Sequence, residues 1–151
     1  MRGPILISAC LAGLRTRFDG KAAPHPRLGD LISRAVLVPV CPEILGGLGI
    51  PRPRCRFVQG DGVQVLAGSA RVVDETGQDR TEGFIRGAQE ALRIVELISP
   101  RLIVLKEGSP SCGLRRVDVQ GHMREGCGVA VALLRGTRIR IITEDDPIPK
   151  D

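Results

Sequence analysis

Four short apolar runs, separated by segments with helical periodicity, constrain the fold of this chain most strongly. The runs cover residues 5–8, 35–40, 101–106 and 138–143, and each is rich in Ile, Leu or Val. Short continuous apolar runs are typical of strands that are buried on both faces. Residues 28–33, 81–98 and 128–134 have the apolar spacing of helices, and Pro100 follows the second of them as a stop signal.

Strands that alternate with helices predict an α/β fold. We expect a single domain over residues 1–151, without a linker, in which helices cover a mostly parallel sheet in a Rossmann-like three-layer arrangement. The segment 62–73 alternates around Ala67-Gly68, which predicts an inserted β-hairpin. Thr81 is expected to cap the helix over 81–98. Right-handed crossovers would bring the carboxyl ends of the parallel strands to one edge, where open α/β sheets bind ligands.

The composition is that of an ordinary globular protein. Hydrophobic residues make up 42% and charged residues 26% of the chain, which argues against disorder. Aromatic residues make up only 2%, so the stacking platforms of a typical single-strand nucleic-acid binder are missing. The net charge of +5 is due mainly to arginine, and it permits a partner with phosphate groups. No run approaches the roughly 18 apolar residues of a membrane span. We therefore expect a cytoplasmic protein with reduced cysteines and no membrane partner.

Three of the five cysteines follow predicted strands. Cys10 comes after the first strand, Cys41 after the second, and Cys112 lies in the loop after the third. Each has glycine or proline close by, and these residues let a loop turn tightly and approach a ligand. Because the carboxyl ends of parallel strands share one edge, three thiols that are distant in sequence are expected to meet there.

Thiolates bind zinc, copper(I) or iron–sulfur clusters. A structural zinc site usually contains close pairs such as C-x-x-C, and this chain has none. Three thiolates would leave one iron of a four-iron cluster free to bind substrate. The alternative is that the cysteines are small buried hydrophobic residues, and this is the interpretation we favour for Cys127. Cys55 lies in an irregular basic loop and is not expected to bind iron. His25 and His122 are expected to be surface residues without a role as ligands.

Several sequence blocks occur here in the order found in a known family. They are Ser8-Ala-Cys-Leu-Ala-Gly, Arg17-Phe-Asp-Gly, Val40-Cys-Pro-Glu-Ile-Leu-Gly-Gly-Leu, Pro51-Arg-Pro, Gly60-Asp-Gly and Leu105-Lys-Glu-Gly-Ser-Pro-Ser-Cys-Gly. From about residue 5 to residue 142 the chain resembles the bacterial thiouracil desulfidase family, formerly a domain of unknown function. The Cys-Pro-Glu and Ser-Pro-Ser-Cys-Gly blocks are specific in combination.

The resemblance implies a [4Fe-4S] cluster with one open iron, held by Cys10, Cys41 and Cys112. It also implies a non-redox, hydrolytic reaction at a C=S bond, in which 2- or 4-thiouracil gives uracil and sulfide. The substrate would be a small thiolated nucleobase. Many relatives carry a further cysteine at the position of Thr16, and we interpret that cysteine as dispensable.

The groups that would carry acid–base chemistry lie beside these motifs. The candidates for a general base are three carboxylates, with the first preferred: Glu43, Asp19 and Glu107. Hydrogen bonds or positive charge at the reacting atoms would come from Ser109, Ser111 and Lys106. Structural alternatives are that Asp19 shapes an Asp-Gly turn, that Glu43 caps a helix, and that Lys106 is solvated.

Two other functions stay open at this point. A desulfidase for thiouridine in tRNA is favoured by the positive charge and disfavoured by the missing aromatic residues. A non-catalytic carrier of a cluster or of sulfide would need thiolates, but it would not need acid–base groups beside them. The carboxylate and serines beside Cys41 and Cys112 therefore favour an enzyme. The sequence carries no prediction of the oligomeric state.

Overall fold

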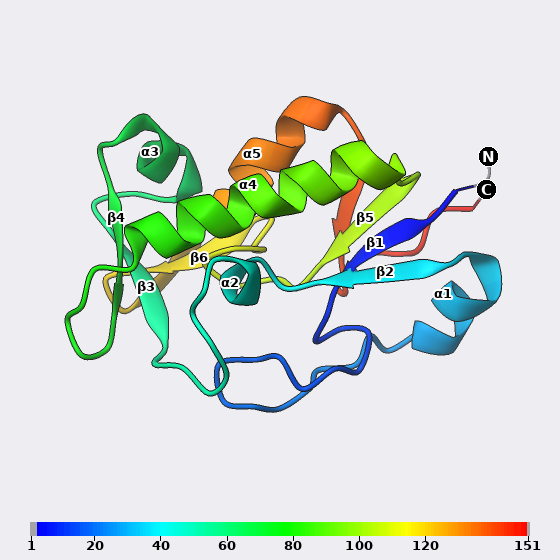
Figure 1. Cartoon of the computed structure of the whole chain (residues 1–151), viewed down its shortest axis with the longest axis horizontal. Helices are drawn as coiled ribbons and strands as arrows, with labels where there is room; N and C mark the ends of the chain where they lie inside the picture. The colour runs from blue at the N-terminus through cyan, green and yellow to red at the C-terminus, as the bar shows by residue number, and fades with distance from the viewer. Residues whose placement is uncertain (1–2, 151) are drawn as a thin grey trace.

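The computed structural model describes residues 3–150, which form two four-stranded sheets joined by one long helix, α4 (Thr81–Ile98) (Figure 1). The first sheet has the order β2-β1-β5-β8, and all its neighbouring strands are parallel. Its strands lie within the four apolar runs: β1 (Ile5–Ser8), β2 (Leu37–Val40), β5 (Leu102–Leu105) and β8 (Ile141–Thr143). The predicted parallel sheet is therefore confirmed.

Helices cover both faces of this sheet, as the three-layer prediction requires. On one face, Val95 of α4 and Val131 of α5 (Val129–Leu134) pack in a core with Leu6 and Ile103. On the other face, Leu31 of α1 (Leu28–Arg34) packs in a second core that contains residues of β1, β5 and β8. The mixed α/β fold class is thus confirmed.

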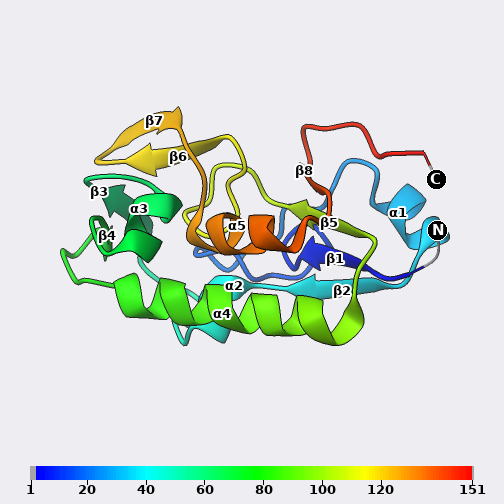
Figure 2. The ribbon, with the colours of Figure 1, turned by 90° about the horizontal axis from the view of Figure 1, so that it is seen from above.

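The second sheet has the order β4-β3-β6-β7 and is mixed. Its strands are β3 (Cys55–Val58), β4 (Arg71–Asp74), β6 (Arg116–Val119) and β7 (His122–Glu125). Only β3 and β6 are parallel neighbours. Phe57 and Val72 pack in a third core with Phe84, which lies near the start of α4. Viewed from above, α4 extends along both sheets (Figure 2), so it contributes to the cores of both.

The prediction of a β-hairpin over residues 62–73 is wrong. Gly62–Ala67 form a helix, α3, and only β4 follows it. Asp61 accepts a hydrogen bond from the backbone of Val63, and Gln64 accepts one from the N–H of Asp61, which is a capping box. Gly68, with φ of 83°, is the left-handed residue that ends the helix. The apparent hairpin turn is therefore a helix C-cap.

The tight hairpin of the second sheet is β6–β7. Its two-residue turn, Gln120-Gly121, has φ of 53° and 90°, which suits a type I′ turn. The helix predicted over 81–98 has those bounds, but its N-cap is Arg80, so the prediction that Thr81 caps it is wrong. Thr81 is already helical, and its hydroxyl accepts a hydrogen bond from the N–H of Val72. Among the described helices, none has the length and apolar content needed to cross a bilayer.

The short helix α2 (Pro42–Leu45) packs so closely on α4 that only glycine fits at the contact. A Cβ on Gly87 would overlap the carbonyl oxygen of Pro42, and a Cβ on Gly46 would overlap that of Gly83. This close approach fixes the segment that follows β2, which carries Cys41 and Glu43.

Gly87→Ala is expected to lower the free energy of unfolding by about 1–3 kcal/mol, because the added methyl group overpacks the contact. Gly29→Ala is the matched control, since Gly29 is also helical but no atom of residues 3–150 lies within 4 Å of the place that a Cβ would take there. That variant should gain up to about 1 kcal/mol from alanine's helix propensity. Urea unfolding measures both effects, and equal changes in the two variants would contradict the close packing.

Candidate active site

A cavity of about 350 Å³ opens at the carboxyl edge of the parallel sheet, where this sheet meets the second one. Cys10, Cys41 and Cys112 all line it. Other parts of its wall come from the start of β3 and from the β6–β7 hairpin, through residues such as Arg116 and Met123. Its volume lies near the lower end of the range for small-molecule sites, about 300–1,000 Å³, which suits a small ligand.

Local backbone structure places each of these cysteines. Cys10 lies in the turn after β1, and its carbonyl oxygen accepts hydrogen bonds from Gly13 and Ala23. Cys41 is the N-cap residue of α2, with Pro42 in the first turn. Cys112 lies in a tight loop after β5, where its N–H donates to the hydroxyl oxygen of Ser109 at 3.0 Å.

Burial raises the pKa of all three thiols. For Cys10 burial is the largest cause, the charge of Cys41 adds to it, and the pKa rises to about 11. Burial likewise raises the pKa of Cys41. For Cys112, burial dominates, and repulsion from Cys41 and Cys10 raises the pKa further. Ionisation of one of these thiols therefore makes ionisation of the others harder. As free thiols they are protonated at neutral pH, and a metal centre has to displace these protons.

Cys55, at the start of β3, also lines the cavity, which the sequence analysis did not predict. Burial, with the nearby charges of Glu43 and Asp74, raises its pKa to about 12. Cys127 is different, because it does not line the cavity and lies in the core with its Sγ 3.5 Å from Nη1 of Arg135. Packing is thus the observed role of Cys127, whereas Cys55 is a fourth thiol at the cavity.

Glu43 lines the cavity from the first turn of α2, and both its carboxylate oxygens have partners. Arg52 Nε donates to Oε1 at 2.9 Å, and Ser111 Oγ donates to Oε2 at 3.3 Å. The side chains of Arg52 and Glu43 are only 5% and 12% exposed. Arg52 Nη2 also lies 4.0 Å from Sγ of Cys41. An ionised carboxylate has about four acceptor positions, so Glu43 is fixed in orientation and still has lone pairs for a ligand in the cavity.

The two serines named by the sequence differ in their relation to the cavity. Ser111 is buried, donates to Glu43, and is not part of the cavity wall. Ser109 lines the cavity, and its oxygen accepts the N–H groups of Ser111 and Cys112, both at 3.0 Å. Because these bonds use only the oxygen's lone pairs, the hydroxyl proton of Ser109 is available to a ligand.

Lys106 lines the cavity at the end of β5, and its Nζ donates to Oε2 of Glu144 at 2.7 Å. The ion pair limits the movement of a side chain that is 32% exposed. Asp19 is not part of the cavity wall, although the two residues before it are. Its oxygens accept the N–H of Lys21 at 3.0 Å and pair with Arg17 at 3.2 Å, as expected of a residue that shapes an Asp-Gly turn.

His25 is buried, with 4% exposure, so the prediction of a surface histidine is wrong for this residue. Its Nδ1 accepts the N–H of Arg27 at 2.9 Å, and its Nε2 has no hydrogen-bond partner among residues 3–150. Burial lowers the pKa of His25 below 6.5; the charge of Glu144 opposes this shift and that of Arg27 adds to it. His122, in contrast, is exposed on β7.

Because the pKa of His25 is lower in the folded state, the stability of the protein is expected to decrease as the pH falls. The contribution of neutral His25 is complete above 6.5, the unfolded-state pKa, and it decreases as the pH falls through the lower folded-state pKa. We expect the urea midpoint to fall between about pH 7.5 and about pH 5.5, and to fall less in His25→Gln. His122→Gln is the control and should behave like the wild type. The same pH dependence in His25→Gln and wild type would contradict this role.

This arrangement is typical of an α/β enzyme: thiols and a fixed carboxylate line a small cavity at the carboxyl edge of a parallel sheet. The family model described as 2-thiouracil desulfurase matches residues 5–146. The chain therefore belongs to the 2-thiouracil desulfurase family, and the predicted family resemblance is confirmed.

Two further similarities agree with this assignment. The uncharacterized protein YbbK of Bacillus subtilis (strain 168) is 36% identical over 145 residues, which cover 94% of this chain and 96% of YbbK. A solved structure of a [4Fe-4S]-dependent thiouracil desulfidase, TudS, is 37% identical, with a TM-score of 0.80. That match covers 95% of this chain and 92% of TudS. The similarity thus extends over the whole fold, including both sheets.

Proposed function

We propose that this protein is a cytoplasmic desulfidase that removes sulfur from a thiolated uracil by a non-redox, hydrolytic reaction at the C=S bond. The observation that carries the proposal is the meeting of Cys10, Cys41 and Cys112 in one cavity with Glu43. The similarity to a [4Fe-4S]-dependent thiouracil desulfidase supports the choice of substrate and cofactor.

The residues of the cavity fit an iron–sulfur cluster. Thiolates are the ligands that such clusters require, and the cavity offers them in a partly buried setting. Cations offset their charge: Lys106 and Arg17 act on Cys10, and Arg52 acts on Cys41, in each case against the larger effect of burial. No three His, Cys, Asp or Glu side chains within residues 3–150 converge on a single metal ion. Thiolates that bind different irons of one cluster do not have to converge in that way.

Cys10, Cys41 and Cys112 would hold the [4Fe-4S] cluster in this proposal. When bound, the cluster supplies a Lewis-acidic iron without a protein ligand, which withdraws electrons from the thiocarbonyl carbon. Glu43 accepts the proton of the water that attacks this carbon. Arg52 and Ser111 orient the Glu43 carboxylate through the hydrogen bonds described above. Ser109 donates its free hydroxyl proton to the ligand, and Lys106 stabilises negative charge that develops in the reaction.

The test is an anaerobic assay of reconstituted protein with 2-thiouracil and 4-thiouracil, without an electron donor. Water replaces sulfur at the carbon, so uracil and sulfide should form in equal amounts and no atom changes its oxidation state. Sulfide release that requires a reductant would contradict the hydrolytic scheme. A fully loaded protein that releases no sulfide from either compound would contradict the proposed substrate.

Thiouridine in tRNA is the second candidate substrate, and the cationic cavity wall favours it. Arg17 and Arg54 lie over the ring of Phe18, 5.8 and 5.2 Å from its centroid, and all three residues line the cavity. Arg116 adds a further positive charge. The same assay with thiouridine-containing tRNA compares the two substrates: faster sulfide release from tRNA than from the free base would favour this candidate.

A further inference from the structure

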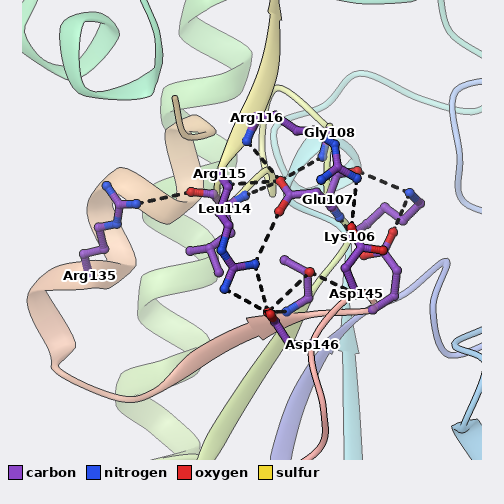
Figure 3. A network of polar contacts seen from close by, with 11 residues as sticks. Lys106, Glu107, Gly108, Leu114, Arg115, Arg116, Arg135, Asp145 and Asp146 are labelled. Carbon is purple, nitrogen blue, oxygen red and sulfur yellow. Dashed lines mark hydrogen bonds and ion pairs between the residues drawn. The ribbon is translucent and has the colours of Figure 1, made fainter. Parts of the chain in front are cut away.

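The carboxylate of Glu107 is the centre of a hydrogen-bond network beside the cavity (Figure 3). Its Oε1 accepts the backbone N–H groups of Gly108 at 3.1 Å, Leu114 at 2.8 Å, Arg115 at 3.1 Å and Arg116 at 3.3 Å. These donors lie at the beginning and at the end of the loop between β5 and β6. One oxygen atom therefore joins the two ends of this loop.

The Glu107 side chain is fully enclosed, with 0% exposure. Its Oε2 is buried and has no hydrogen-bond partner among the described residues; the closest cation is Nη1 of Arg115, 3.9 Å away. Arg115 in turn pairs with Asp146 at 3.0 Å (Figure 3). Burying a carboxylate is costly, and hydrogen bonds that it accepts from N–H groups offset this cost. The environment of Glu107 is that of a structural carboxylate rather than of a base that meets water.

The loop that Glu107 closes carries Ser109, Ser111 and Cys112. Ser109 Oγ accepts the N–H groups of the other two, and Gly113 donates its N–H to the carbonyl oxygen of Ser109. The loop is so compact that a Cβ on Gly113 would lie 2.8 Å from that carbonyl oxygen. A change in the spacing of the loop ends would therefore move Cys112 and Ser109 together.

Glu107 is itself fixed to the edge of the parallel sheet. Its N–H donates to Oε1 of Glu144, just after β8, at 2.8 Å. The preceding N–H, of Lys106, donates to Ser8 Oγ at the end of β1, at 2.9 Å. Glu107 thus links the loop to the edge of the parallel sheet.

We propose that Glu107 is a positioning residue that holds the loop over residues 108–116, and so holds Cys112 and Ser109 in place opposite Glu43. The importance of Cys112 as a ligand rests on the proposed function. The shape of the loop is independent of the proposed function, because the hydrogen bonds that define it involve only residues of this chain.

Hydrogen–deuterium exchange of the metal-free protein tests the proposal independently of activity. In the wild type, the N–H groups of Gly108, Leu114, Arg115 and Arg116 should be as protected as those of the core strands. Glu107→Gln removes the charge at nearly constant size, and it should speed exchange at these four positions by about 10- to 100-fold. Glu107→Asp keeps the charge but shortens the side chain, so its exchange should be intermediate.

Asp74→Asn is the matched control. Asp74 is also a buried carboxylate that accepts two backbone N–H groups, from Thr76 and Gln78, and pairs with Arg80 at 2.9 Å. The turn that it holds contributes no residue to the cavity. This variant should lower thermal stability while leaving exchange in the loop unchanged.

Iron retention provides the second measurement. After anaerobic reconstitution, Glu107→Gln should lose iron to a chelator about tenfold faster than Asp74→Asn of equal thermal stability. Unchanged exchange of the four loop N–H groups in Glu107→Gln, or rapid exchange of these groups in the wild type, would overturn the proposal. Equal iron loss from the two variants would overturn the link to Cys112. None of these results depends on whether the protein desulfurates thiouracil.

Discussion

Replacing Cys10, Cys41 or Cys112 by serine is expected to reduce the bound iron from about four atoms per chain to none, since an iron–sulfur cluster depends on its thiolate ligands. Three ligands are the minimum in this account, so the loss of one leaves the cluster with only two. The measurement is an iron and sulfide assay after reconstitution without oxygen. Cys127→Ser is the control, because Cys127 is buried away from the cavity.

Cys55→Ser distinguishes this ligand set from a rival that the structure introduces. Cys55 lines the same cavity, so a cluster with four thiolate ligands has to be considered. We expect Cys55→Ser to keep about four irons, because substrate binding requires one iron without a protein ligand. Loss of iron in this variant, full iron in the serine variant of Cys10, Cys41 or Cys112, or stoichiometric zinc without iron uptake would contradict the proposed ligands.

Glu43→Gln is expected to slow desulfuration by about 10²–10⁴-fold, the usual loss when a positioned general base is removed. Glutamine keeps the size of the side chain and one acceptor for Arg52 and Ser111, but it does not accept a proton. The cluster should be retained, since it depends on thiolates rather than on this carboxylate. Sulfide release and iron content are therefore measured on the same sample.

Asp118→Asn is the matched control for Glu43→Gln. Asp118 also lines the cavity, and its Oδ1 accepts the N–H of Gly121 at 2.8 Å within the β6–β7 turn. We expect this variant to keep most of the activity. Wild-type rates in Glu43→Gln with a full complement of iron would remove Glu43 from the mechanism.

Much of the fold follows from local sequence patterns. The apolar runs predict the four parallel strands, because strands buried on both faces have no polar alternation. The helix over Thr81–Ile98 follows from its periodicity and from Pro100. The hairpin predicted at residues 62–67 is wrong because this segment is short. Six residues with Val63 and Val65 are too few to distinguish the two-residue period of a strand from the 3.6-residue period of a helix. Asp61 and Gln64, three positions apart, were the signal for a helix start.

The cysteines at the strand ends were predictable because topology brings the carboxyl ends of parallel strands together. Other features depend on tertiary contacts that no short pattern encodes. Cys55 reaches the cavity through β3, a strand that the sequence analysis did not predict. The Pro51-Arg-Pro block marked the position of Arg52, but its pairing with Glu43 arises only when the loop packs against α2. Glu107 was named as a base, and only the folded loop shows its four N–H donors.

The most direct test of the central claim is an anomalous-scattering map, recorded at the iron edge, of crystals reconstituted without oxygen. We predict one four-iron cluster in the cavity at the carboxyl edge of the parallel sheet. Its protein ligands should be the sulfurs of Cys10, Cys41 and Cys112, and one iron should face Glu43 without a protein ligand. A cluster bound by Cys55 in place of any of these three, or an iron site elsewhere in the molecule, would contradict the account.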